Sequence, residues 1–302
     1  MILSVLIGKA WNKLPFRRRS RLNGTDGFQW VLYVLLTLAS LFMLLPLFYI
    51  FNHSLKPYNE LFVYPPNVFV RKPTLQNFVE LFAVTGSSVV PVSRYFFNSV
   101  VVSVMVVVGT IVVSALCAYP ISKHRFPGQR TLFAVILLSL MYAPETVAIP
   151  RYLVMVNLHM INTYWAHVLP NLAAPVGVFL MKQFIDQVPN ELLEAAKIDG
   201  AKEWQIFLRV VIPICMPAVA TISILAFQGI WSSTEASALF MQEETMKTFP
   251  FFLTTLTNGL ANSVARQGAA AAAALIMFLP NFIIFLFFQR KVITTMAHSG
   301  IK

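Results

Sequence analysis

The sequence predicts an all-α polytopic membrane protein with six transmembrane helices. Of its 302 residues only 12% are charged and 57% are hydrophobic, whereas a soluble globular protein is about one-quarter charged. Uncharged stretches recur along the chain, and most of them reach the ~20 residues that a membrane-spanning helix needs. Buried core helices of a soluble protein would rarely be so long and so numerous, so we expect a lipid bilayer as the main solvent.

The expected spans are distributed along the whole chain. The third is the least regular, because it stops at Glu145 before the chain continues apolar to Val156. In the last span, the glycine and alanines of residues 268–274 would allow close packing against another helix. In chain order, the spans are residues 27–52, 95–122, 131–144, 157–181, 210–234 and 267–289.

The lysines and arginines predict the orientation of the chain, because cytoplasmic loops are enriched in them. The segment 1–28 is basic and is expected in the cytoplasm, together with the loop 186–209 and the tail 291–302. The six-helix transmembrane domain then covers residues 29–290. This topology accounts for the net charge of +11 without a nucleic-acid partner. The first apolar run is too long for a signal-peptide core, so we expect a retained anchor.

Two longer segments, residues 55–93 and 231–262, are expected on the outer side of the membrane. The first contains several prolines, which favour an ordered loop of extended and turn geometry. The second mixes acidic and aromatic residues. This second loop either meets a soluble partner or is a solvated connector, and the sequence leaves both readings open.

One polar block interrupts the apolar pattern, the stretch ELLEAAKIDGAKEWQIFLRVVIP at residues 191–213. Pro189 and the following glutamates suit the first turn of a short helix, and Gly200 suits its end. A second short helix, residues 201–209, would carry Trp204, Phe207 and Leu208 on its apolar side. The spacing therefore predicts a helix–turn–helix that docks on a partner; an amphipathic helix lying on the lipid surface is the alternative.

The spacing within this block resembles the EAA loop of ABC-importer membrane subunits. In that pattern Glu-Ala-Ala is followed after three residues by Gly, and nine residues later by a short aliphatic run that ends in Pro. The matching positions are Glu194, Ala195, Ala196, Gly200 and Pro213. Three further stretches, PTLQNF (73–78), FFNSVVVS (96–103) and AYPISKHRFPGQR (118–130), resemble the carbohydrate-uptake branch with MalG-like permeases.

The resemblance implies an ABC-importer type I permease fold, in which the loop 186–209 couples to an ATPase. The first short helix would sit in a groove of that subunit, where Glu194 could pair with a basic group and Gly200 would set the angle to the second helix. The expected coupling residues are Glu191, Glu194, Ala195, Ala196, Asp199, Gly200, Lys202 and Trp204.

The resemblance also implies a set of partners in a bacterial inner (cytoplasmic) membrane. These are a second, non-identical permease subunit, two ATP-binding subunits, an extracytoplasmic solute-binding protein and an oligosaccharide. ATP and Mg²⁺ would be bound by the ATPase subunits, so no cofactor is expected on this chain.

The chain shows no motif for chemistry of its own. It contains no G-x-x-x-x-G-K-[ST] phosphate loop, no HExxH and no GxSxG, and its five histidines lack metal-ligand spacing. We therefore expect no catalytic residue and no metal site, and a transporter subunit, not an enzyme. A channel or a membrane enzyme is the alternative from a different class.

A few polar side chains at membrane depth are candidates for a translocation path, because desolvating them is costly. They are Glu145, Arg151, Asn262 and Arg266; a local ion pair or snorkelling at the helix ends is the alternative explanation. Basic residues expected near the outer mouth favour an acidic oligosaccharide such as an alginate or pectin oligouronide, and a neutral maltodextrin-like sugar is the alternative. These basic residues are Arg71, Lys72, Arg94, Arg151 and Arg266.

Overall fold

The computed structural model describes residues 27–61, 63, 67, 69–83, 90–257 and 266–299. Nearly all of the expected basic segment 1–28 lies outside this range, as do Asn262 and the last residues of the expected tail. The chain divides into two units, Met1–Tyr49 and Ile50–Lys302. Helix α2 (Gly27–Leu55) provides the described part of the first unit and its last turn belongs to the second.

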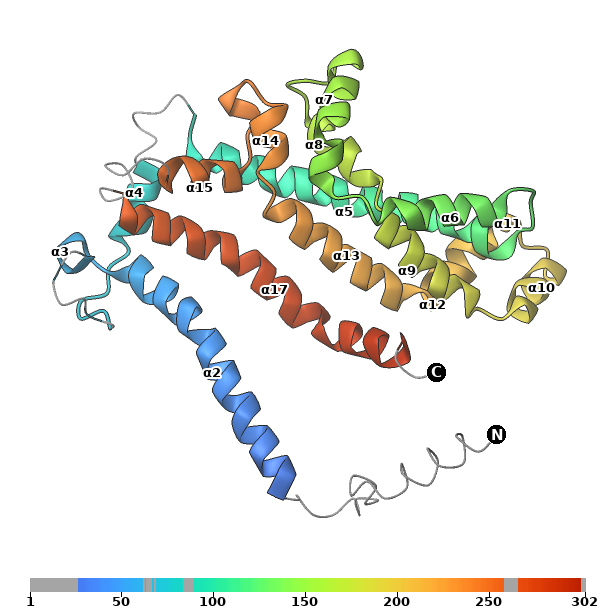
Figure 1. Ribbon diagram of the computed structural model, residues 1–302, viewed down its shortest axis with the longest axis horizontal. Helices are drawn as coiled ribbons and strands as arrows, with labels where there is room; N and C mark the ends of the chain where they lie inside the picture. Colours follow the sequence, from blue (N-terminus) through green and yellow to red (C-terminus); the bar gives the residue numbers. More distant parts are fainter. Residues whose placement is uncertain are drawn as a thin grey trace, which may run out of the picture. The chain divides into compact units, whose positions relative to one another are not determined.

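In the second unit, the regular secondary structure of the described residues consists of helices (Figure 1). Short helices connect and flank the long ones, and no strand occurs among the residues described. The helices of more than one turn are α4 (Gln76–Ala83), α5 (Val92–Lys123), α6 (Gln129–Ser139), α7 (Ala148–Asn157), α8 (Tyr164–Leu172), α9 (Pro175–Asp186), α10 (Asn190–Ile198), α13 (Met216–Trp231), α14 (Glu235–Leu239), α15 (Phe249–Thr257) and α17 (Gln267–Ser299). The shorter ones are α3 (Tyr58–Leu61), η2 (Pro144–Val147), α11 (Glu203–Ile206), the π-helical turn η3 (Phe207–Val211), α12 (Ile212–Ile214) and η4 (Glu244–Met246).

The expected membrane spans correspond to these helices. Four described stretches are long and apolar enough to cross a membrane: α2, α5, Met216–Leu239 and Gln267–Gln289. A fifth span forms if α8 and α9, which meet at an angle of 47°, cross the membrane together. Helix α6 is apolar but shorter, and it occupies the expected third span. The count of six is therefore reached with one bent and one short span.

Two prolines explain why the third and fourth spans are not straight. A residue before proline avoids the helical region. Ala143, before Pro144, is extended, with φ −69° and ψ 136°, so the expected continuation to Val156 is interrupted and resumes only as α7. In the same way, Ala174 before Pro175 has φ −107° and ψ 86°, and it separates α8 from α9.

The core of the second unit lies between α5 and its neighbours. Helix α5 packs against α8, α9 and α13, and α13 packs against α17 (Figure 1). Near the start of α17, Ala269, Ala272 and Ala273 are buried against aromatic residues of α5 and α15. The close packing expected from residues 268–274 is therefore present, because small side chains let neighbouring backbones approach.

Candidate functional site

The polar block forms the first short helix where the sequence predicts it. Helix α10 begins directly after Pro189, whose extended backbone precedes the first turn. Glu191 lies in that first turn and Lys197 in the last. Both charges complement the helix dipole, because the N-terminal end is partially positive and the C-terminal end partially negative.

Gly200 ends this helix in the left-handed conformation, with φ +82°, as its position in the sequence predicts. Its N–H donates to the Lys197 carbonyl at 3.0 Å, and the Ala201 N–H donates to the Ala196 carbonyl at 3.0 Å. This pair of bonds is a Schellman motif, which satisfies carbonyls that the helix end leaves free. A Cβ atom at Gly200 would meet nothing within 4 Å, so the requirement for glycine comes from the backbone angle and not from space.

The second short helix differs from the expected segment 201–209. Helix α11 begins only at Glu203, and it continues without interruption through the π-helical turn η3 into α12. The Lys202 N–H is capped by Gln205 Oε1 at 2.8 Å. Of the predicted apolar side, Phe207 is buried, whereas Trp204 and Leu208 are exposed; the Trp204 ring centre lies 5.4 Å from that of Phe207. Trp204 and Phe207 therefore lie on the same side of the helix, and of the two only Phe207 is covered by the core.

Glu203 joins this block to the rest of the molecule. The Tyr119 hydroxyl of α5 donates to Glu203 Oε1 at 2.6 Å. His124 Nε2 lies 3.1 Å from the same oxygen and Lys197 Nζ lies 3.3 Å from Oε2. The Tyr119 hydrogen bond, followed by Lys197 and His124, lowers the pKa of the Glu203 carboxyl below its ordinary value. Glu203 is absent from the residues predicted by sequence, because its partner in α5 is 84 positions away.

A second tie fixes the beginning of α10. Lys123 Nζ, at the end of α5, donates to the Val188 carbonyl at 2.6 Å and to Asn190 Oδ1 at 3.0 Å. Leu193 turns inward and is buried in the same core cluster as Ile206 and Phe207. The polar block is therefore held against the ends of α5 and α9 and does not hang free as a loop.

The side of the block that faces away from this core carries large apolar side chains. Ile198 is 86% exposed, Trp204 58% and Leu192 46%. Around them the expected coupling residues Glu191, Glu194, Ala195, Asp199, Gly200 and Lys202 are exposed, and Ala196 is half-buried. An exposed apolar patch with a charged rim on a fixed element is typical of a surface that binds another protein.

The candidates for a translocation path do not form one cluster. Arg151, near the start of α7, forms an ion pair with Glu235 at the start of α14. Glu145 is exposed in η2, and Arg266 is half-buried in the turn before α17. Among the described residues, no hydrogen bond or ion pair connects these three candidates. For Arg151 the structure thus supports the alternative of a local ion pair.

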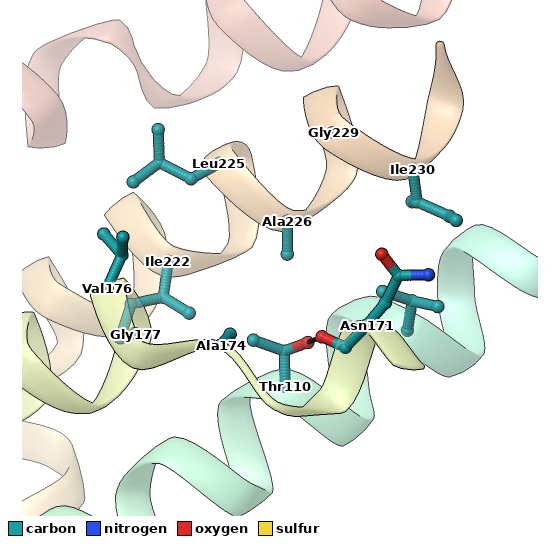
Figure 2. Close-up of a pocket in the computed structure, with 11 residues that line it drawn as sticks. Thr110, Asn171, Ala174, Val176, Gly177, Ile222, Leu225, Ala226, Gly229 and Ile230 are labelled. Carbon is teal, nitrogen blue, oxygen red and sulfur yellow. Dashed lines mark hydrogen bonds between the residues drawn. The ribbon is translucent and has the colours of Figure 1, made fainter. Parts of the chain in front are cut away.

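Polar groups inside the helix bundle lie elsewhere, at the break between α8 and α9. A cavity of about 310 Å³ opens there, and its walls come from α5, α8, α9 and α13. Thr110 and Asn171 lie toward each other in it (Figure 2), with Thr110 Oγ1 3.3 Å from the Asn171 carbonyl. Neither residue is among those predicted from the sequence, because no charged residue lies beside either of them in the chain. The rest of the lining is mainly apolar. Broken helices beside a cavity are common in transporters.

The far end of α5 fixes the segment around η4. Asn98 is fully buried, and its Nδ2 donates to the Thr245 and Lys247 carbonyls at 2.8 Å each, while Oδ1 accepts from the Tyr164 hydroxyl at 2.7 Å. The Tyr95 hydroxyl donates to Glu244 Oε2 at 2.9 Å. This part of the expected outer loop 231–262 is therefore anchored to α5 and α8, as a preformed surface would need.

Comparison with known proteins places the chain among transport components. The family model described as "Binding-protein-dependent transport system inner membrane component" matches residues 5–292. The arabinooligosaccharides transport system permease protein AraQ of Bacillus subtilis is 30% identical over 267 residues, which are 88% of this chain and 92% of AraQ.

Two solved structures share the fold. One is a bacterial ABC transporter involved in the import of the acidic polysaccharide alginate. It has a TM-score of 0.75 and 22% identity, over 92% of this chain and 99% of the other. The second is a bacterial alginate ABC transporter in complex with an alginate pentasaccharide-bound periplasmic protein, with a TM-score of 0.60 and 19% identity, over 89% of this chain and 96% of the other.

Proposed function

Because this chain belongs to the family of binding-protein-dependent transport system inner membrane components, we propose that it is one of two permease subunits of an ATP-driven importer for an oligosaccharide. It would form half of the translocation pathway. Residues 186–209 would couple ATP hydrolysis by a cytoplasmic ATPase to conformational change in that pathway. The observation that carries this proposal is the fixed polar block with its exposed apolar patch.

Several predictions made from the sequence are confirmed. The chain is a carbohydrate ABC-importer permease by resemblance, its fold is the all-α polytopic fold of such permeases, and its relatives are transport permeases and not enzymes. A channel or membrane enzyme is thereby excluded as the main alternative. The chain is a multi-pass membrane protein, with several apolar helices and membership of an inner membrane family.

Force from an ATPase would pass through the polar block to the membrane spans. A partner that grips Ile198, Trp204 and the backbone around Ala195 would pull on α10. Glu203 connects the block to the end of α5 through its hydrogen bond with Tyr119 and its contact with His124. Lys123 makes a second connection by donating to the Val188 carbonyl. Movement of the partner would therefore reach α5, whose other side packs on the walls of the membrane cavity, and tilt the spans between inward- and outward-facing states.

The remaining partners follow from this scheme. Six spans provide half of a cavity, so a second permease, by family resemblance a different chain, would complete it. Two ATPase subunits would bind ATP and Mg²⁺, and an extracytoplasmic solute-binding protein would dock on the outer segments. The complex with a periplasmic protein among the similar structures supports such a partner. Both termini and residues 186–209 would lie in the cytoplasm.

We propose an acidic oligosaccharide as the substrate, such as an alginate or pectin oligouronide. Cations near the outer segments would attract such an anionic sugar. Two of the expected cations already have partners in the protein: Arg151 is paired with Glu235, and Arg94 donates to the Thr245 carbonyl and to the Tyr164 hydroxyl. Arg71 and Lys72 are exposed and Arg266 is half-buried. A neutral oligosaccharide is the second candidate, which the relative for arabinooligosaccharides favours.

The assembly can be tested by purifying the tagged chain from gently solubilised native membranes and identifying what accompanies it by mass spectrometry. We expect an ATPase with a phosphate-binding loop and a second six-span permease. Glu194→Lys should remove the ATPase from the preparation, while the second permease remains. Isolation of the wild-type chain alone, or only with copies of itself, would contradict the proposal. Uptake of uronide and arabinose oligomers would then distinguish the two substrate classes, with Arg266→Ala expected to weaken only the acidic one.

A further inference from the structure

A second cavity, separate from the one in the helix bundle, lies at the end of α5 that carries the polar block. Its volume is about 410 Å³, and its walls come from the last turn of α5, the start of α6, one residue of α9 and the first residue of α10. The side chains around it are mainly basic, and no acidic residue belongs to its described lining. These basic residues are Lys123, His124, Arg125, Arg130 and Lys182. We call this cavity the basic pocket.

Three of the five basic side chains already have partners in the protein. Lys182 pairs with Asp186 at 2.6 Å, and His124 lies beside Glu203. Lys123 donates to the Val188 carbonyl and to Asn190. For Arg125 and Arg130, by contrast, no hydrogen bond or ion pair is formed with any described residue, and both are exposed. The pocket therefore presents two guanidinium groups that the described part of the chain does not neutralise.

The surroundings of these arginines are apolar on one side. Phe133 belongs to the wall of the pocket, and the Lys182 ammonium lies 4.8 Å from the centre of its ring. Farther along α6, Leu132, Val135 and Leu138 are about half exposed. The short helix that carries Arg130 in its first turn thus also carries exposed apolar side chains along its length, within the expected third membrane span.

We propose that the basic pocket binds the phosphate group of an anionic glycerophospholipid. Arginine matches phosphate because its planar guanidinium donates two parallel hydrogen bonds. Arg125 and Arg130 would hold the phosphate, and the acyl chains would cover the exposed apolar side chains of α6. Basic pockets at the membrane surface favour anionic lipids in this way.

A protein partner with an acidic surface is the competing occupant. It would satisfy the two arginines, but it would leave the exposed apolar side chains of α6 to be covered by something else. A lipid satisfies both features with one molecule, because it carries its charge and its chains together. The lipid is therefore the occupant that the charges and the apolar side chains favour jointly.

The test uses the full-length chain, purified in mild detergent with the subunits that accompany it. After removal of native lipid, phosphatidylglycerol or phosphatidylcholine is added and bound lipid is counted by native mass spectrometry. We expect the wild type to prefer phosphatidylglycerol. Arg125→Gln and Arg130→Gln should each weaken its binding about fivefold, as expected for one basic residue near the membrane surface. Arg209→Gln removes an exposed charge outside the pocket and should change nothing.

Arg130→Lys keeps the charge and should retain most of the preference, and unchanged elution of all variants in size-exclusion chromatography verifies their folding. Equal binding of the two lipids by the wild type would overturn the proposal, as would equal losses in the pocket variants and Arg209→Gln. Displacement of the lipid by millimolar glycerol phosphate would assign the site to a soluble phosphate ester instead. If the pocket variants lost the ATPase but kept the lipid preference, the occupant would be a protein.

Discussion

The Tyr119 hydroxyl donates a hydrogen bond of 2.6 Å to Glu203 Oε1, and this bond joins a membrane-spanning helix to the polar block outside it. The same carboxylate forms an ion pair with Lys197 of α10, whose Nζ lies 3.3 Å from Glu203 Oε2. One side chain thereby holds three segments, the end of α5, the end of α10 and the start of α11. A force applied to α10 cannot move it without straining this junction, so the junction is where coupling can be weakened selectively.

Tyr119→Phe removes the hydroxyl and retains the ring that packs on Phe207. Because Glu203 is partly exposed and water can replace the lost donor, we expect a local loss of about 1 kcal/mol. Hydrogen exchange should accelerate in residues 190–206, and substrate uptake should fall while ATPase subunits still bind. Tyr95→Phe is the matched control, since its hydroxyl donates to Glu244 at the other end of α5. Equal acceleration of residues 190–206 in both variants would contradict the role of the junction.

The junction should depend on pH in one direction. The hydrogen bond that Glu203 accepts from Tyr119, followed by its basic neighbours, lowers the pKa of the Glu203 carboxyl in the folded protein below the ordinary value of 4.5. The ionised form therefore stabilises the fold above the ordinary value, and this contribution is lost as the pH falls through the lowered pKa. Protection factors of residues 190–206, corrected for intrinsic exchange, should be constant from neutral pH to about pH 5 and then fall. Glu203→Gln should remove this step; an identical acid step in that variant would assign it to other groups.

Gly200 is required for its backbone angle and not for its small size. Gly200→Ala should destabilise the turn after α10 by about 1 kcal/mol, since alanine is strained at φ +82°. Gly200→Asn should recover part of the loss because asparagine tolerates this region. Gly200→Pro should abolish uptake while membrane insertion continues. Uptake assays on all three variants, with insertion verified by membrane fractionation, should rank activity as asparagine above alanine above proline. Equal activity of the alanine and asparagine variants would contradict the requirement for a left-handed backbone at Gly200.

The Arg151–Glu235 pair should act as a structural link between α7 and α14. If the pair is local, Arg151→Gln and Glu235→Gln should have similar effects, of no more than about 1 kcal/mol each because both side chains are partly exposed. The double variant should be no worse than either single one. Uptake of acidic and neutral sugars should fall by the same factor. A selective loss of acidic-sugar uptake in Arg151→Gln alone would show that Arg151 meets the substrate.

Much of the fold was accessible from the sequence, because span length and missing charge are strong signals in a bilayer. The end of α10 at Gly200 was equally accessible, since helices commonly end at a left-handed residue and glycine adopts that conformation without strain. The third span was ended at residue 144 because of the charge of Glu145, whereas the backbone break that Pro144 causes was not predicted, although the proline is visible. Prolines inside spans are tolerated often enough that their position alone does not indicate a break.

The candidate site was predictable only where its residues are close in the chain. The motif from Glu194 to Pro213 is local, so its spacing could be read directly. Glu203, Lys123 and Asn171 act through partners in other helices, and a single sequence contains no record of such contacts. Which residues of the apolar side of α11 and η3 are buried was not predictable either, because Tyr119, which packs on Phe207, belongs to another helix.

The central claim, that the polar block docks on an ATPase, can be measured with a photo-reactive amino acid at Ile198. This side chain is 86% exposed on α10, and Ile149 on α7, 75% exposed, is a matched control position. On irradiation of native membranes, we predict a covalent adduct with a P-loop ATPase from position 198 and none from position 149. Adducts from position 198 with lipid alone, in membranes where the subunits still co-purify, would contradict the claim and assign the block to the membrane surface.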